Sequence, residues 1–543
     1  MKTLLLCLMA WFCLAAVADQ TDDIEALRSQ IEYLAESRYL DGSAVEIAAR
    51  DLIVDFYNRR NFVPAWEDPA QVEALLAAIR DSAADGLNPL DYHQAAVAAA
   101  HEMWFSAGAI SAEDRALREI VLTDSLIRLG YHQLFGKVNP YRLDPNWNYR
   151  RELNAQDPVL VLQSVIDSPS LGESLKQLAP RGWLYQRLRA ALADYRGLQA
   201  RGGWPQVPEG PTLKPGQPDE RLGILARRLL VTGDMSETGE PQPSSYNDRL
   251  VAGVRRFQTR HGLDADGVIG PATLTALNVP VEQRINQLVL SLERARWVMS
   301  DIQDAFVLVN IAGFRAYVVR DGEIVWQTRV QVGKEYRQSP VFRDEIKYLV
   351  FNPTWTVPYS IATKDLLPKV QRDPNYLTDR NFVVKDRSGA AVSSGNVDWS
   401  KLGPKNFPYT LVQGPGPMNA LGRVKFIFPN EHAVYLHDTP NRNLFERAER
   451  AFSSGCIRVE HPFDLAEALL GDDGWTQERF EDVLRSGKTQ TVFLSKPLPV
   501  FLLYWTADVG QDGTVHFYND VYGRDAAVSR GLKEPFRLEP PGG

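Results

Sequence analysis

The cysteines of this chain give its clearest chemical signal, because removal of an N-terminal leader would leave a single one. Cys7 and Cys13 lie in the apolar run Leu4–Ala18, which follows a lysine and ends in small residues. This pattern is typical of a secretory signal peptide, here residues 1–18, that is cleaved on export. Cys456 would then remain without a disulfide partner. An unpaired thiol beside a glycine and close to an arginine is typical of a nucleophile.

The base that such a thiol needs is predicted from the histidines near it. A thiol becomes a reactive thiolate near neutral pH when a neighbouring base accepts its proton. His437 ends the predicted strand 433–437, where a side chain is well placed to project into a cleft. His432 begins the same strand, about 16 Å away by the rise of an extended chain, and His461 precedes a proline at the start of a predicted helix. We therefore expect His437 to be the base.

The residues around Cys456 are predicted to form a tight turn and to contact substrate. Gly455 permits a positive φ angle, and the backbone N–H groups of Gly455 and Cys456 could stabilise an oxyanion. Ser454 is expected to shape this turn. Arg458 could hold a substrate carboxylate or brace the loop, and both interpretations stay open.

The segment that contains these residues has the pattern of a β-rich domain. Its predicted strands are Ala305–Val309, Phe314–Arg320, Glu323–Val332, Tyr348–Phe351, Val424–Phe428, Ala433–His437, Thr491–Leu494 and Val500–Trp505. A long polar insertion at 359–407 interrupts them, and an insertion of this length is often a lid or binding loop. Tyr435 and Trp355 could line a substrate cleft or belong to the core, and the sequence does not decide between these positions.

The segments upstream of the β-rich region are predicted to be helical. Apolar residues recur at helical spacing over Ile24–Arg38, Ala44–Arg59, Ala70–Ala84 and Leu117–Leu134. We therefore predict a helical scaffold domain over 22–201, followed by a linker rich in glycine and proline. A compact unit of three helices is expected at 219–279 and a β-rich catalytic domain at 283–530, with a tail at 531–543. The predicted fold is multidomain α+β.

Composition narrows the class of protein further. At 543 residues the chain is too long for one hydrophobic core. A net charge of -8 gives no support for nucleic-acid binding, which requires basic patches. Beyond the leader the sequence predicts no integral membrane segment, so we expect an exported protein of the periplasm. Neither an HExxH motif nor clustered Cys and His residues occur, so no metal and no cofactor are predicted.

The predicted three-helix unit resembles the peptidoglycan-binding type 1 module. The resemblance rests on Val254-Arg-Arg-Phe-Gln258, His261-Gly-Leu263, Asp266-Gly-Val-Ile-Gly-Pro-Ala-Thr273 and Leu277-Asn278. It implies a domain that binds cell-wall glycan. A role as a spacer without affinity is the alternative, because a shared fold does not establish a ligand.

The β-rich segment resembles the L,D-transpeptidase catalytic domain of YkuD type. That family has a histidine, a spacer and the pattern [S/T]-x-G-C-hydrophobic-[R/N], matched here by His437 and Ser453-Ser-Gly-Cys-Ile-Arg458. Many members have histidine at the position of Ser454, and its replacement is typical of the large multidomain branch. Further matches to that branch are Phe351-Asn-Pro-Thr-Trp-Thr-Val-Pro358, Gly414-Pro-Gly-Pro-Met-Asn-Ala-Leu-Gly422, Tyr435-Leu-His-Asp-Thr-Pro440, Tyr504-Trp-Thr-Ala507 and Asp520-Val-Tyr-Gly-Arg-Asp525.

This resemblance implies an enzyme that forms 3-3 cross-links between peptidoglycan stem peptides. Cys456 would attack the carbonyl of diaminopimelate in a tetrapeptide stem and release D-Ala, with His437 as the base. The amine of a second stem would then take the acyl group. In this family a backbone carbonyl usually orients the histidine, which disfavours a triad role for Asp438. Carbapenems, which mimic the donor, are expected to acylate Cys456.

Three other functions compete with this one. With water as the acceptor, the same nucleophile would make the protein an L,D-carboxypeptidase or endopeptidase. A non-catalytic wall-binding protein would need neither Cys456 nor His437. A papain-like hydrolase is disfavoured because its cysteine precedes its histidine in the chain. The sequence does not indicate an oligomeric state, an activating partner or the natural acyl acceptor.

Overall fold

The structure is a computed structural model that describes residues 20–41, 45–105, 110–144, 147–148, 153, 156–236, 243–299 and 304–538. The predicted signal peptide lies outside the described residues. The chain divides into two compact units. The first comprises Met1–Trp204, Val279–Asp301 and Arg524–Gly543, and the second comprises Pro205–Asn278 and Ile302–Gly523. The domain boundaries proposed from the sequence remain predictions.

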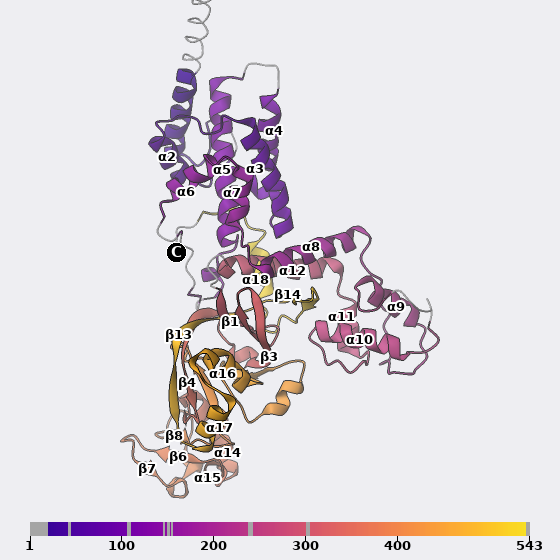
Figure 1. Cartoon of the computed structure of the whole chain (residues 1–543), viewed down its shortest axis with the longest axis vertical. Helices are drawn as coiled ribbons and strands as arrows, with labels where there is room; N and C mark the ends of the chain where they lie inside the picture. The colour runs from indigo at the N-terminus through magenta and orange to yellow at the C-terminus, as the bar shows by residue number, and fades with distance from the viewer. Residues whose placement is uncertain are drawn as a thin grey trace, which may run out of the picture. The chain divides into compact units, whose positions relative to one another are not determined.

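The first unit is built from helices (Figure 1). They are a helix over residues 20–36, α2 (Arg50–Arg59), α3 (Pro69–Asp81), α4 (Gln94–Trp104), α5 (Ala112–Phe135), α6 (Pro158–Ile166), α7 (Leu171–Leu178), α8 (Trp183–Ala200), α12 (Val281–Met299) and α18 (Asp525–Gly531). Every residue of α5 from Glu119 to Gly130 is buried. A helix that is buried all round lies inside a bundle, so α5 is the central helix of this unit.

A buried arginine connects α12 to other parts of the first unit. Glu293 and Arg296 are both fully buried, with Nη2 of Arg296 2.7 Å from Oε2 of Glu293. Nη1 of Arg296 donates to the Asp85 carbonyl at 2.8 Å and to the Tyr185 hydroxyl at 2.9 Å. Arg296 is thus bound by Glu293 within α12 and by two groups far away in the sequence, which fixes this helix against α8 and the turn at Asp85.

The second unit contains a small helical part and a β-rich part. The helical part comprises α9 (Leu222–Val231), α10 (Asp248–Arg260) and α11 (Pro271–Leu277). Its core includes Leu225, Val254 and Phe257. Asn247 caps α10 by accepting a hydrogen bond from the N–H of Leu250. The three helices lie where the sequence predicts them.

A nine-stranded sheet forms the β-rich part, in the order β11-β3-β12-β10-β9-β4-β13-β1-β2, and β2 also pairs with β3. Its strands are β1 (Ala305–Asn310), β2 (Arg315–Arg320), β3 (Glu323–Gly333), β4 (Phe342–Phe351), β9 (Val424–Ile427), β10 (Leu436–His437), β11 (Ala451–Ser453), β12 (Ile457–Val459) and β13 (Gln490–Leu503). Helices α16 (Pro462–Leu470) and α17 (Gln477–Arg485) follow β12, and the hairpin β14 (Ala507–Val509) and β15 (Val515–Phe517) follows β13. The helical N-terminal region and the β-rich C-terminal domain confirm the predicted α+β class.

The insertion predicted as a lid is a folded subdomain with a sheet of its own (Figure 1). The strand order is β5-β8-β6-β7. Its elements are β5 (Trp355–Thr356), α13 (Tyr359–Ile361), a π-helical turn over Ala362–Leu366, α14 (Leu367–Arg372), α15 (Tyr376–Asp379), β6 (Phe382–Lys385), β7 (Ala391–Val392) and β8 (Thr410–Gln413). Apolar residues including Val357, Leu377 and Leu411 form its core.

One predicted strand is shorter than expected. The sequence predicts 433–437, but β10 comprises only Leu436–His437. Ala433 has a φ angle of 50°, in the left-handed region that interrupts a strand. The Asn430 side chain donates to the Val434 carbonyl and accepts from the Val434 N–H. This side-chain bridge holds the chain in a turn up to Val434, in competition with sheet pairing.

In the part of the chain that the structure describes, no helix has both the length and the apolar character needed to cross a membrane.

Candidate active site

Two parallel strands bring the predicted site residues to one face of the sheet. β10 pairs with β12 in the register Leu436↔Ile457 and His437↔Arg458. The N–H of Ile457 donates to the Tyr435 carbonyl at 3.1 Å, which extends the pairing back to Cys456 and Tyr435. Because side chains alternate between the faces of a sheet, Tyr435, His437, Cys456 and Arg458 share one face.

The turn before β12 is held by serine side chains. Gly455 has a φ angle of 119°, which strongly favours glycine. Its N–H donates to Ser453 Oγ at 3.1 Å, and the same hydroxyl donates to the Cys456 carbonyl at 2.6 Å. From another strand connection, Ser339 Oγ donates to the Gly455 carbonyl at 2.7 Å. The conformation around Cys456 is therefore fixed on both sides.

The Cys456 thiol is partly buried in a site with two cations. Its Sγ lies 3.8 Å from the Ala433 carbonyl oxygen. Burial raises the pKa of the Cys456 thiol, while the backbone and hydroxyl of Tyr435 and the charges of Arg458 and Lys425 act in the opposite direction. Burial has the larger effect, so the resting cysteine is a protonated thiol at neutral pH.

His437 is buried and uncharged. Burial lowers its pKa to about 3, with a further contribution from the positive charge of Arg458. Its Nδ1 lies 2.5 Å from the Asp438 carbonyl oxygen. A carbonyl can only accept, so Nδ1 carries the proton in this contact, and the backbone of Leu421 also hydrogen-bonds to the imidazole. A neutral imidazole with this tautomer can accept a proton from a thiol.

The Asp438 carboxylate is used by the backbone and not by the histidine. It accepts hydrogen bonds from the N–H of Arg423 at 2.9 Å and of Thr439 at 2.8 Å. Arg442 lies 3.2 Å from the same carboxylate. The backbone carbonyl of Asp438, and not its side chain, orients His437.

Comparison with known proteins places this site in a recognised domain. Residues 304–491 match the family model of the L,D-transpeptidase catalytic domain. This part of the chain, which contains Cys456 and His437, is similar to that domain. Residues 226–277 match the "Putative peptidoglycan binding domain" and residues 51–192 match the scaffold domain. Both the match at 226–277 and the predicted peptidoglycan-binding module include α10 and α11.

A curated relative and two solved structures carry the same description as the catalytic domain. The "Putative L,D-transpeptidase" of Haemophilus influenzae is 40% identical over 249 residues, which are 46% of this chain and half of that protein. An L,D-transpeptidase from Mycobacterium smegmatis is 12% identical, with a TM-score of 0.17, over 37% of this chain and 58% of that one. One from Xylanimonas cellulosilytica is 14% identical, with a TM-score of 0.19, over 55% of this chain and all of that one. Scores this low do not show a shared fold.

Two of the predicted substrate-binding residues lie next to Cys456. Tyr435 contacts His437 edge to face, with ring centroids 5.6 Å apart, and its hydroxyl hydrogen-bonds to the Cys456 thiol. Arg458 donates from Nη1 to Gln331 Oε1 at 3.1 Å, while its Nε is buried and has no hydrogen-bond partner.

The other two predicted substrate-binding residues have contacts of a different kind. Ser454 is exposed and accepts a hydrogen bond from Arg337 Nη1 at 2.9 Å. Trp355 lies in β5 and packs against Phe382, with ring centroids 6.2 Å apart, so it contributes to the core of the lid. Trp355 is therefore a core residue, while a role of Tyr435 in binding substrate stays a prediction.

Two cationic residues of this site were missed by the sequence analysis. Lys425 pairs with His437 across β9 and β10 and so lies on the face of Cys456. Arg337 donates both to Ser454 and to Asp365 of the lid, the latter at 2.6 Å. A lysine between buried apolar residues of a strand usually points to solvent, and an arginine in a loop carries no signal of its partners. The pairing of strands distant in the sequence reveals the position of Lys425, and the contacts of the folded loop reveal that of Arg337.

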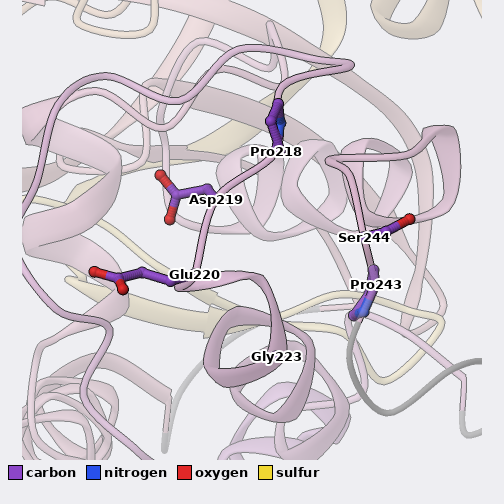
Figure 2. A pocket seen from close by; sticks show the side chains of 6 residues that line it. All are labelled: Pro218, Asp219, Glu220, Gly223, Pro243 and Ser244. Carbon is purple, nitrogen blue, oxygen red and sulfur yellow. The ribbon is translucent and has the colours of Figure 1, made fainter.

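A hollow lies in the helical part of the second unit. It has a volume of about 490 Å³ and is lined by Pro218, Asp219, Glu220, Gly223, Pro243 and Ser244. Figure 2 shows the two carboxylates on one side of it and Ser244 with Pro243 on the other. Asp219 is already paired with Arg221 at 2.8 Å. The lining has no thiol or imidazole.

Proposed function

We propose that the protein is an L,D-transpeptidase that forms 3-3 cross-links through an acyl-enzyme on Cys456. The observation that carries this proposal is the register of β10 and β12, by which the neutral imidazole of His437 and the thiol of Cys456 share one sheet face. Such a pair is the minimum needed for nucleophilic catalysis by a thiol.

The reaction proceeds in two acyl transfers. His437 Nε2 takes the thiol proton as Cys456 Sγ attacks the diaminopimelate carbonyl of a tetrapeptide stem. The imidazolium then returns this proton to the leaving amine of D-Ala, and a thioester remains. The side-chain amine of a second stem attacks the thioester, and His437 takes a proton from that amine and passes it to the departing thiolate. A new amide bond replaces the one that was broken.

The oxyanion of each tetrahedral intermediate is assigned to the backbone N–H of Cys456. The N–H of Gly455 is already donated to Ser453 Oγ, so its role is to hold the turn. Tyr435 keeps its proton because burial raises its pKa, and its hydroxyl is available to substrate beside the thiol. Donors fixed before the reaction stabilise the developing charge most effectively.

The proposed substrates and partners are peptidoglycan stem peptides and, through the peptidoglycan-binding domain, glycan strands. The proposed location is the periplasm, after removal of residues 1–18. Carbapenems would acylate Cys456 in place of the donor stem.

Product analysis tests the proposal. The full-length mature chain is incubated with purified disaccharide-tetrapeptide, and the products are separated and identified by mass spectrometry. We expect a cross-linked dimer together with free D-Ala. Tripeptide monomer without dimer would instead identify an L,D-carboxypeptidase. Absence of any product, or undiminished product from Cys456→Ala, would refute the assignment of the nucleophile.

A further inference from the structure

A row of three polar residues crosses the strands beside Cys456. Lys425 on β9 pairs with His437 on β10, and His437 pairs with Arg458 on β12. Residues paired across neighbouring strands have their Cβ atoms about 4.5–5.5 Å apart on the same face. The neutral imidazole of His437 is therefore flanked by a cation on each side.

Neither cation has an acidic partner among the residues that the structure describes. Arg458 donates to the uncharged amide of Gln331, and its Nε is buried without a hydrogen-bond partner. The Lys425 ammonium lies over the Tyr435 ring, 5.5 Å from its centroid. A thiolate at Cys456 would stabilise the charged forms of both Lys425 and Arg458, and it is the one titratable group that would do so for both.

Two partly buried cations without an anion are costly, and the cost falls when an anion binds between them. The resting thiol is protonated, so it does not supply this charge. The site is therefore complementary to an anionic group that arrives with the substrate and binds close to the sulfur.

We propose that Lys425, together with Arg458, forms a subsite for the terminal carboxylate of the donor stem peptide. This inference rests on the proposed function. In a tetrapeptide stem the carboxylate of D-Ala lies three bonds beyond the carbonyl that Cys456 attacks. A cation beside the sulfur can therefore bind this carboxylate while the carbonyl is in place for attack.

The subsite explains how donor length is selected. An additional C-terminal residue moves the terminal carboxylate about 3.5 Å further along an extended chain. The carboxylate would then be beyond the two cations, which would face an uncharged amide. Such a donor leaves the charges of Lys425 and Arg458 unpaired and reacts more slowly.

The test varies the carboxylate and the lysine separately. The substrates are disaccharide-tetrapeptide with a free terminal D-Ala and the same compound with terminal D-alaninamide. The full mature chain is compared as wild type, Lys425→Met and Lys425→Arg, and kcat/KM for release of the terminal residue is measured by mass spectrometry. Lys347→Met is the matched control, because Lys347 is an exposed lysine of the neighbouring strand β4.

We expect the wild type to prefer the acid over the amide by at least about ten-fold, the value of one charge-assisted hydrogen bond. Lys425→Met should lose about ten-fold on the acid and much less on the amide, so that the preference disappears. Lys425→Arg should restore the preference, and Lys347→Met should behave as the wild type. Binding of acid and amide to Cys456→Ala, by titration calorimetry, should show the same preference without turnover.

The outcomes separate this inference from the function on which it rests. If Lys425→Met slows both substrates equally, Lys425 acts through the thiol or through Tyr435, and the subsite is refuted while the transpeptidase remains. If the wild type does not distinguish acid from amide, the subsite is likewise refuted. If the wild type releases no D-Ala at all, the proposed function fails and the subsite fails with it.

Discussion

At the scale of single residues, the site depends on a neutral histidine oriented by the backbone. His437 Nδ1 contacts the Asp438 carbonyl oxygen at 2.5 Å, and in the proposed mechanism Nε2 accepts the thiol proton. This differs from a triad, in which a carboxylate stabilises the imidazolium. The backbone contact of His437 and its burial each lead to a prediction.

The first concerns Asp438. Asp438→Asn keeps the backbone carbonyl but replaces one carboxylate oxygen that accepts from the N–H of Arg423 or Thr439. We expect kcat to fall less than about ten-fold and the free energy of unfolding to fall by about 1 kcal/mol, the value of one hydrogen bond. Steady-state kinetics and urea denaturation measure these changes. A fall in kcat of about 10⁴-fold, as in a triad, would contradict the assignment.

The second concerns the stability of the sheet in acid. Folding lowers the pKa of His437 to about 3, while an unfolded histidine titrates near pH 6.5. Below about pH 6.5 the unfolded chain therefore binds a proton that the folded chain does not, and stability falls by about 1.4 kcal/mol per pH unit until about pH 3. Hydrogen exchange of β9 and β10 amides at pH 7 and pH 5 measures this loss. The variant His437→Gln should lack the part of this stability loss that comes from protonation of His437. An equal loss of stability in both proteins would refute the prediction.

The chemistry at this scale could be predicted only in part. Cys456 and His437 were predicted as thiol and base from residue type, spacing and the family resemblance, and the structure places them on one face of the sheet. Lys425 was not found, since its role depends on strand pairing that the sequence does not display. Its neighbours Val424 and Phe426 indicate a half-buried strand but not what the other face contacts.

At the scale of elements, the lid is connected to the turn of the nucleophile through one arginine. Arg337 lies in the connection between β3 and β4 and donates to Asp365 in the π-helical turn of the lid and to Ser454 Oγ. The same connection contacts the turn again, where the N–H of Lys334 donates to the Ser453 carbonyl at 3.1 Å. The position of the lid and the position of Cys456 are thus coupled.

We expect Arg337→Ala to lower kcat/KM on the tetrapeptide by up to about thirty-fold, because two hydrogen bonds of about 1 kcal/mol each are lost. Asp365→Ala should share part of this loss, and the double variant should be less affected than the sum of the two. Arg485→Ala, which removes an exposed ion pair with Asp482, is the matched control and should have no effect. Additive effects of Arg337→Ala and Asp365→Ala would show that the lid and the turn are independent.

The elements themselves were largely predictable where the apolar pattern is regular. The predicted helices of the first unit follow their periodicity. β4 (Phe342–Phe351) is longer than the predicted Tyr348–Phe351, and the strands predicted at Thr491–Leu494 and Val500–Trp505 form one strand, β13 (Gln490–Leu503). The strands that carry the site do not follow a regular apolar pattern. β10 is shortened by the turn at Ala433, and β12 has only three residues, Ile457–Val459. Such short strands are stabilised by pairing with β3 and β9, and local sequence says little about pairing.

At the scale of the whole molecule, each compact unit has its own stabilising interactions. In the first unit α12 is held by the fully buried pair of Glu293 and Arg296. Breaking such a pair from one side leaves a buried charge without compensation. The helical periodicity of α12 was predictable, but the partners of its charged residues were not, because Asp85 and Tyr185 are far away in the sequence.

We expect Arg296→Met to lower the free energy of unfolding of the first unit by about 3–5 kcal/mol. The double replacement of Arg296→Met with Glu293→Gln should recover part of this loss, since it removes the remaining charge. Urea denaturation followed by circular dichroism measures the effect in the full chain. A loss below about 1 kcal/mol would show that the pair contributes little.

In the proposed reaction Cys456 carries the acyl group between two stem peptides. The most direct measurement is intact-mass spectrometry of the full mature chain, quenched with acid during turnover of disaccharide-tetrapeptide, followed by peptide mapping. We expect an adduct equal to the donor without D-Ala, attached to the peptide that contains Cys456. It should be released by hydroxylamine, as a thioester is, and be absent from Cys456→Ala. An adduct at another residue, or one that persists in Cys456→Ala, would contradict this expectation.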